Sequence, residues 1–183
     1  MVEPLSLGSP RWDELSTRMG LRGGRVRDAL RALADDPSES HVFNEMWPEI
    51  CSEETTYDAA YAAAPYLVSF AEQMPTGDDL EYLIVLGLIA TYAEQIPGDL
   101  EPAYRRALTR AQTLVLERLS ECPVDHNLRY LLAAVAAFRG RTDLADVLGN
   151  LDAIQEPCPS CATVVFPTEL QQVIERDQGG AFA

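Results

Sequence analysis

The segment Tyr57–Gln73, with the sequence YDAAYAAAPYLVSFAEQ, constrains the fold more than any other part of this chain. Its alanine, leucine and phenylalanine residues recur at helical spacing, which predicts a helix with one apolar face. Because most of that face is alanine, a neighbouring helix can approach it closely. Pro65 lies inside the predicted helix, where it removes one backbone donor. An alanine-faced helix that is followed by another apolar helix favours a stack of helical hairpins.

The chain before this segment also reads as helix. A short helix is predicted over Arg11–Met19, and a second carries the apolar stripe of Val26, Leu30 and Leu33. A serine hydroxyl can satisfy a free amide at the start of a helix. Ser38 is therefore the predicted N-cap of the next helix, which leads into the alanine-faced one.

After this segment, the uncharged run Tyr82–Ala93 predicts a helix that is buried on all sides. Glycine costs about 1 kcal/mol relative to alanine in the middle of a helix, so Gly87 indicates close contact with another helix. The sequence ATVVFP, at 162–167, is the one good strand candidate.

These elements predict an all-α fold, built as a short right-handed stack of antiparallel helical hairpins with a small non-helical C-terminal segment. The hairpins are expected at about 38–73, 78–121 and 125–155. A unit of this kind cannot bury its apolar face alone, so neighbouring units stack. We expect a single domain over residues 1–170, followed by a tail at 171–183.

The pattern from residue 42 to residue 73 resembles the small bacterial HEAT-like repeat proteins. Those proteins carry a tryptophan-bearing helix, a polar turn, a Tyr/Thr-x-Ala start and an Ala-Ala-x-Pro-x-Leu helix. The matching positions here are Trp47, Tyr57, Ala59, Ala63, Pro65 and Leu67. The resemblance extends over about residues 38–166 and implies an α-α superhelix that works through its surfaces rather than through an active site.

Charge is the least ordinary property of the chain. It has 29 acidic and 14 basic residues, a net charge of −15, and every basic residue is arginine. Residues 37–104 hold thirteen acids and no arginine. Such a surface disfavours nucleic acids and anionic membranes, and it favours a basic protein, whose approach it would steer electrostatically. A solvated acidic face that only maintains solubility explains the same pattern.

If the acids do form a binding surface, its candidate residues come from two clusters around the alanine-faced helix. They are Glu45, Glu49, Glu53, Glu54, Asp58, Asp78, Asp79 and Glu81. The prediction requires these side chains to share one outward wall of the stack, without neutralisation by the chain's own arginines.

Cysteine supplies the one recognisable ligand motif, Cys158-Pro-Ser-Cys161. Two thiolates at this spacing suit zinc, but a closed structural site needs four ligands, and Cys51 and Cys122 lie in other parts of the chain. Packing thiols or a degenerate zinc knuckle explain the motif as well. We therefore expect no cofactor, with Cys158 and Cys161 as the candidate zinc ligands.

The sequence predicts a binding protein rather than an enzyme. Its two histidines fit no nucleophilic triad, and its acids lack the glutamate and histidine spacing of helical di-metal sites. The hypotheses are an immunity protein that neutralises a basic cognate bacterial toxin, a general scaffold or adaptor, and a HEAT-like DNA-repair glycosylase. The last would need a basic groove for phosphates, which the charge pattern disfavours.

The location that we expect is the cytoplasm. The first residues show no basic head followed by an apolar core, as a secretory signal would. The longest uncharged runs are also too short to cross a bilayer.

Overall fold

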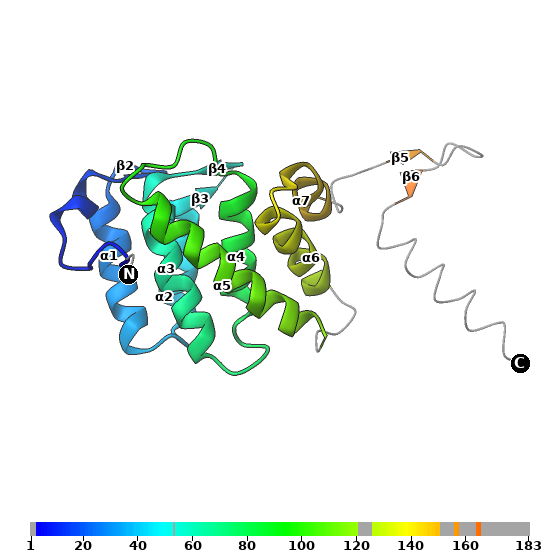
Figure 1. Ribbon diagram of the computed structural model, residues 1–183, viewed down its shortest axis with the longest axis horizontal. Coiled ribbons are helices and arrows are strands. Elements are labelled where there is room, and N and C mark those ends of the chain that lie inside the picture. Colours follow the sequence, from blue (N-terminus) through cyan, green and yellow to red (C-terminus); the bar gives the residue numbers. More distant parts are fainter. Residues whose placement is uncertain (1–2, 53, 121–125, 151–155, 158–163, 166–183) are drawn as a thin grey trace, which may run out of the picture.

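The computed structural model describes residues 3–52, 54–120, 126–150, 156–157 and 164–165 and is mainly helical, which confirms the all-α prediction in its coarse form (Figure 1). The helices of the described part are α1 (Gly23–Asp35), α2 (Ser40–Ile50), α3 (Asp58–Gln73), α4 (Leu80–Thr91), α5 (Glu101–Leu119), α6 (His126–Phe138) and α7 (Thr142–Gly149).

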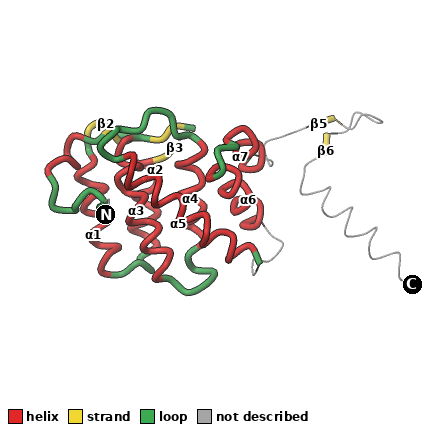
Figure 2. The backbone as a smooth tube through the Cα atoms, in the orientation of Figure 1, coloured by secondary structure: helices red, strands yellow, loops and turns green. Residues whose placement is uncertain are grey.

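Three pairs of helices that are two apart in the chain pack side by side. Helix α1 packs on α3, α3 packs on α5, and α4 packs on α6, while α3 contacts α4 and α5 contacts α6 between these rows. Figure 2 shows the same succession, from α1 at one end of the helical region to α6 and α7 at the other. Consecutive helices alternate in direction, so the α1–α2 and α3–α4 connections lie at the same edge of the molecule.

The alanine-faced helix α3 forms the centre of the core, as its sequence predicts. Its fully buried residues include Ala60, Ala63 and Leu67, and the helix continues through Pro65. The small side chains let α5 approach, and Tyr104 of α5 contacts Tyr61 of α3 edge-on, with ring centroids 5.1 Å apart. Aromatic pairs favour this geometry because the positive ring edge meets the negative ring face.

Helix α4 is buried on nearly all sides, as its uncharged sequence predicts. Gly87 lies against Ala134 of α6, and a Cβ atom on the glycine would stand only 2.5 Å from the Ala134 Cβ. Gly87 therefore marks a close contact between α4 and α6, as the sequence indicates.

The predicted helix over Arg11–Met19 is wrong. A 3-10 helix, η1 (Pro10–Glu14), is followed by a two-stranded hairpin of β1 (Ser16–Thr17) and β2 (Gly20–Leu21). Gly20 has a positive φ of 94°, and the Thr17 hydroxyl donates to its carbonyl. This turn chemistry, rather than apolar periodicity, decides the local structure.

The predicted N-cap at Ser38 is also wrong. Helix α2 begins at Ser40, and the Ser38 hydroxyl donates instead to the Asp36 carboxylate at 2.6 Å. The Ser38 amide donates to the same oxygen, so Asp36 folds the connection into an Asx turn.

Two further strand pairs lie in the described residues. The polar turn between α2 and α3 is a hairpin of β3 (Cys51–Ser52) and β4 (Thr55–Thr56), which the sequence reading did not predict. The predicted strand within 162–167 is present as β6 (Val164–Val165), which pairs with β5 (Glu156–Pro157).

Candidate functional site

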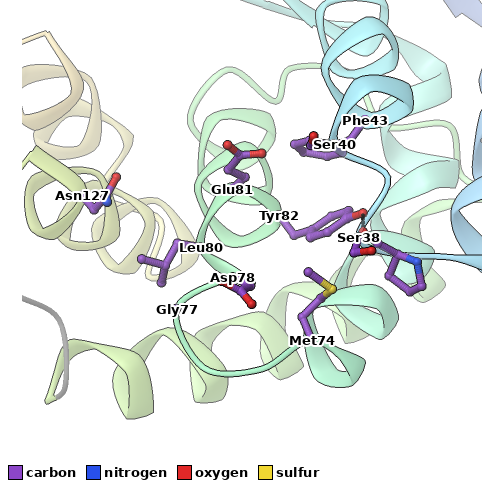
Figure 3. A pocket seen from close by; sticks show the side chains of 11 residues that line it. Ser38, Ser40, Phe43, Met74, Gly77, Asp78, Leu80, Glu81, Tyr82 and Asn127 are labelled. Carbon is purple, nitrogen blue, oxygen red and sulfur yellow. Dashed lines mark hydrogen bonds between the residues drawn. The ribbon is translucent and has the colours of Figure 1, made fainter.

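A cleft of about 480 Å³ lies at the edge where α2 and α4 begin (Figure 3). Its walls come from the α1–α2 connection, the first turn of α2, the α3–α4 connection, the first turn of α4 and the start of α6. The lining residues are Pro37, Ser38, Ser40, Phe43, Met74, Gly77, Asp78, Leu80, Glu81, Tyr82 and Asn127.

Tyr82 holds the apolar side of the cleft together. Its hydroxyl donates to the Pro37 carbonyl at 2.7 Å, which ties α4 to the α1–α2 connection. Its ring stands 4.4 Å from the ring of Phe43 and 5.9 Å from that of Phe70, measured between centroids. Because three elements fix this aromatic cluster, the cleft is formed before any partner arrives.

Two of the predicted acids, Asp78 and Glu81, line this cleft from the α4 side and are exposed. Among the described residues that line it, none is basic. Asp35, Asp36 and Glu39, all exposed, flank the Pro37–Ser38 stretch in the chain and add negative charge to the same edge. We call these five side chains the acidic edge.

The acidic edge affects the pKa of Tyr82. The pKa of Tyr82 is raised to about 12, first by burial and then by the negative charges of Glu81 and Asp36. A guanidinium or ammonium group that entered the cleft would meet the carboxylates of Asp78 and Glu81.

Asp79 does not belong to this surface, although it follows Asp78 directly. Its side chain is completely buried, where the Arg118 Nε donates to its Oδ2 at 2.6 Å. The Gly77 amide donates to the other carboxylate oxygen at 3.0 Å. Asp79 therefore joins the α3–α4 connection to α5 and is unavailable to a partner.

Glu45 and Glu49 lie elsewhere, in a groove between α1 and α2. Arg22 and Arg25 line the same groove, so the local charge is balanced. Glu45 also lies 3.4 Å from the Nε2 of His41. These glutamates are exposed or half-buried, but they do not form part of a purely negative wall.

The acids around the β3–β4 hairpin lie at the opposite end of α4 from the cleft. Thr56 of this hairpin donates to the carbonyl of Ile89, near the end of α4, and Glu54 occupies the turn. Asp58 accepts a hydrogen bond from the Ser16 hydroxyl, which in turn accepts from the Asp58 amide. Glu53 lies outside the described residues. Of the seven predicted acids that the structure describes, Asp79 is buried and the other six lie on separate surfaces, so only Asp78 and Glu81 share the cleft.

The candidate zinc ligands Cys158 and Cys161 lie outside the described residues. Within the described ranges, no group of three or more histidine, cysteine, aspartate or glutamate side chains is arranged to hold a metal ion. Cys51 is a buried free thiol whose pKa is raised by burial. None of the helices in this part of the chain has the length and apolar character needed to span a membrane.

The sequence did not predict the uncharged half of the cleft. Its lining residues are Ser38, Ser40, Phe43, Met74 and Tyr82. One signal could have found it. In a chain of alternating helices, every second connection lies at the same edge, so the loops that follow α1 and α3 can be expected near each other. The partner of Asp79 left no comparable signal, because Arg118 lies 39 positions away along the chain.

The chain matches no protein-family model, and comparisons with curated proteins and with solved structures give no match either.

Proposed function

We propose that this chain is a non-catalytic binding protein for a basic protein and, most specifically, an immunity protein that neutralises a basic cognate bacterial toxin. The observation that supports this proposal best is the acidic edge beside the cleft. Asp78 and Glu81 line a formed cavity in which no described lining residue is basic.

The cleft suits an arginine or lysine side chain of the partner. The carboxylates of Asp78 and Glu81 would accept charge-assisted hydrogen bonds from its head group. The aliphatic stem of the same side chain would pack on Phe43, Met74 and Tyr82, which supply the apolar part of the lining.

The charge of the whole chain assists this encounter. A net charge of −15 attracts a cationic protein over distances of about one Debye length, roughly 8–10 Å at physiological ionic strength. Complementary charge raises association rates more than it raises final affinity. An inhibitor that must capture a toxin before the toxin acts benefits from fast association.

The helical arrangement agrees with a HEAT-like solenoid, and we include that architecture in the proposal. The helix rows α1, α3, α5 and α4, α6 have the side-by-side order that stacked hairpins produce. We also place this activity in the cytoplasm, where Cys51 would remain a free thiol.

The test is rescue of growth. The chain is co-expressed with the toxic products of genes adjacent to its own, and the purified pair is measured by titration calorimetry at low and high salt. Rescue, together with a direct complex that weakens as salt rises, is the expected result. If the chain rescued growth from none of these gene products and formed no complex with any of them, the immunity function would be overturned.

A matched pair of variants assigns the surface. Reversal of Asp78 and Glu81 to arginine should weaken the complex by about 100-fold, since like charges then face the partner's cation. Glu54→Arg with Glu94→Arg makes the same change of net charge at the far end of α4 and should leave the complex within about threefold of wild type. Equal effects of the two pairs would show that total charge, rather than the cleft, drives binding.

A further inference from the structure

A second candidate interface is the groove between α1 and α2, which has a volume of about 380 Å³. It shares no lining residue with the acidic cleft. One wall consists of Arg22, Arg25, Val26 and Ala29, and the other of Val42, Glu45, Met46 and Glu49.

Each wall follows the face of one helix, with Arg22 directly before the first residue of α1. The positions on both sides follow the spacing i, i+3, i+4 and i+7, which places them in a row along a helix. The two helices run antiparallel through a short connection, and the Arg18 amide donates to the Glu49 carbonyl at 2.9 Å. Arginines and glutamates therefore face each other at the same end of the groove.

The opposite charges do not pair across it. Among the described residues, Arg22 and Arg25 make no ion pair, and Glu49 makes none either. Charges of both signs thus remain available on facing walls, one sign to each wall.

The base of the groove is apolar. Val26 and Met46 are buried, and Ala29 and Val42 are half-buried. Leu21, which immediately precedes Arg22, is 70% exposed on the β1–β2 hairpin, where it adds apolar surface next to the arginine end. The apolar surface that a ligand can reach thus comes from Ala29, Val42 and Leu21, and it lies between a cationic and an anionic wall.

We propose that this groove binds an amphipathic helix of a partner protein. Its apolar stripe would lie on the half-buried Ala29 and Val42, above the buried Val26 and Met46. The acidic side of the partner helix would face Arg22 and Arg25, and its basic side would face Glu45 and Glu49. Helix walls offer no unpaired backbone groups to an added strand, so a helix is the element that suits the groove. This partner need not be basic, so the inference goes beyond the proposed function.

The experiment uses a fluorescent 14-residue helical peptide of net charge zero, with a leucine stripe, glutamates along one edge and lysines along the other. Anisotropy with the full chain should give a dissociation constant of about 1–100 μM, typical of a single helix in a groove. A second peptide of identical composition, with glutamate and lysine alternating along both edges, should bind at least about tenfold more weakly. Equal binding of both peptides, or no binding at 1 mM, would overturn the proposal.

Charge exchange in the protein provides the sharper control. Arg22→Glu with Arg25→Glu should weaken binding of the first peptide at least about tenfold, and so should Glu45→Arg with Glu49→Arg. The four changes together exchange the walls at constant net charge, and the peptide can bind in the reverse direction, so affinity should return. Failure of this recovery in a folded quadruple variant would contradict the proposal.

Two more measurements separate the alternatives. Asp78→Arg with Glu81→Arg should leave peptide binding unchanged, because the cleft is a different surface. Sedimentation of the wild-type chain should show no self-association through the groove. Self-association of that kind would be recognised because the groove variants would abolish it. Such self-association would assign the groove to a second copy of the chain and overturn the partner helix.

Discussion

Gly87 of α4 and Ala134 of α6 meet so closely that a Cβ atom on the glycine would lie 2.8 Å from the Ala134 Cα. Because the obstacle includes backbone, a side-chain rotation cannot relieve it. Gly87→Ala should force α4 and α6 apart and lower the free energy of unfolding by about 1–3 kcal/mol, despite the better helix propensity of alanine. Urea denaturation followed by circular dichroism measures this change.

Gly149 provides the matched control, since it is also a helical glycine but has open space around its Cβ position. Gly149→Ala should change stability by no more than about 1 kcal/mol, and in the stabilising direction. If Gly87→Ala stabilised the protein as Gly149→Ala does, the close contact of α4 with α6 would be wrong.

The buried pair of Asp79 and Arg118 should be one of the most sensitive positions in the chain. Asp79→Asn leaves the Arg118 guanidinium, whose side chain is only 15% exposed, without its counter-charge. Removing one partner of such a pair costs about 3–5 kcal/mol, a large share of a typical domain's 5–15 kcal/mol. Thermal and urea denaturation of the variant should show this loss.

The control for this prediction is the exposed pair of Arg141 and Asp143, which are 62% and 71% exposed. Asp143→Asn should cost less than about 1 kcal/mol, because solvent screens an exposed pair. Replacing both Asp79 and Arg118 by apolar residues should cost less than the sum of the two single changes. Strict additivity would contradict a direct interaction.

The position of Asp79 also shows where the sequence is informative and where it is not. Helical periodicity predicted α3 and α4, and the cost of a mid-helix glycine indicated the contact at Gly87, because both depend on spacing within one element. Exposure of an acid depends instead on what the fold places opposite it. Asp78 and Asp79 are adjacent in the chain, yet one lines a cleft and the other is buried against Arg118.

The same limit applies to short irregular segments. Ser38 had the residue type of an N-cap, but the Asp36 carboxylate competed for its hydroxyl. Glu45 and Glu49 were candidates for the acidic surface, but the start of α1 brings Arg22 and Arg25 beside them. In each case a neighbour that no pattern specifies decides the outcome.

Stability should fall at alkaline pH because Tyr82 remains protonated in the fold. Burial raises the pKa of Tyr82 to about 12, whereas an unfolded tyrosine titrates near 10. Below pH 10 the group is neutral in both states, and its contribution is complete. Between pH 10 and 12 only the unfolded state loses the proton, so the free energy of unfolding decreases as pH rises.

Tyr82→Phe removes this titration together with the hydrogen bond to the Pro37 carbonyl. At pH 7 the variant should be less stable by about 1 kcal/mol. That gap should narrow as pH rises from 10 to 12, and urea denaturation at each pH follows it. A constant gap across this window would show that Tyr82 titrates normally in the folded protein.

The β3–β4 hairpin contains the remaining strained position, Glu54, the one residue other than glycine with a positive φ in the described part of the chain. Ser52 pairs with Thr55, so the loop has two residues, a length that favours turns with positive φ. Left-handed backbone costs a residue with a Cβ about 1–2 kcal/mol, and glycine avoids most of that cost. Glu54→Gly should therefore raise the free energy of unfolding by about 0.5–1 kcal/mol, measured by urea denaturation.

Glu54→Gln keeps the strain while it removes the charge, and should have little effect, whereas the β-branched Glu54→Val should destabilise the hairpin. If glutamine stabilised the protein as much as glycine, relief of charge repulsion rather than of backbone strain would explain the gain.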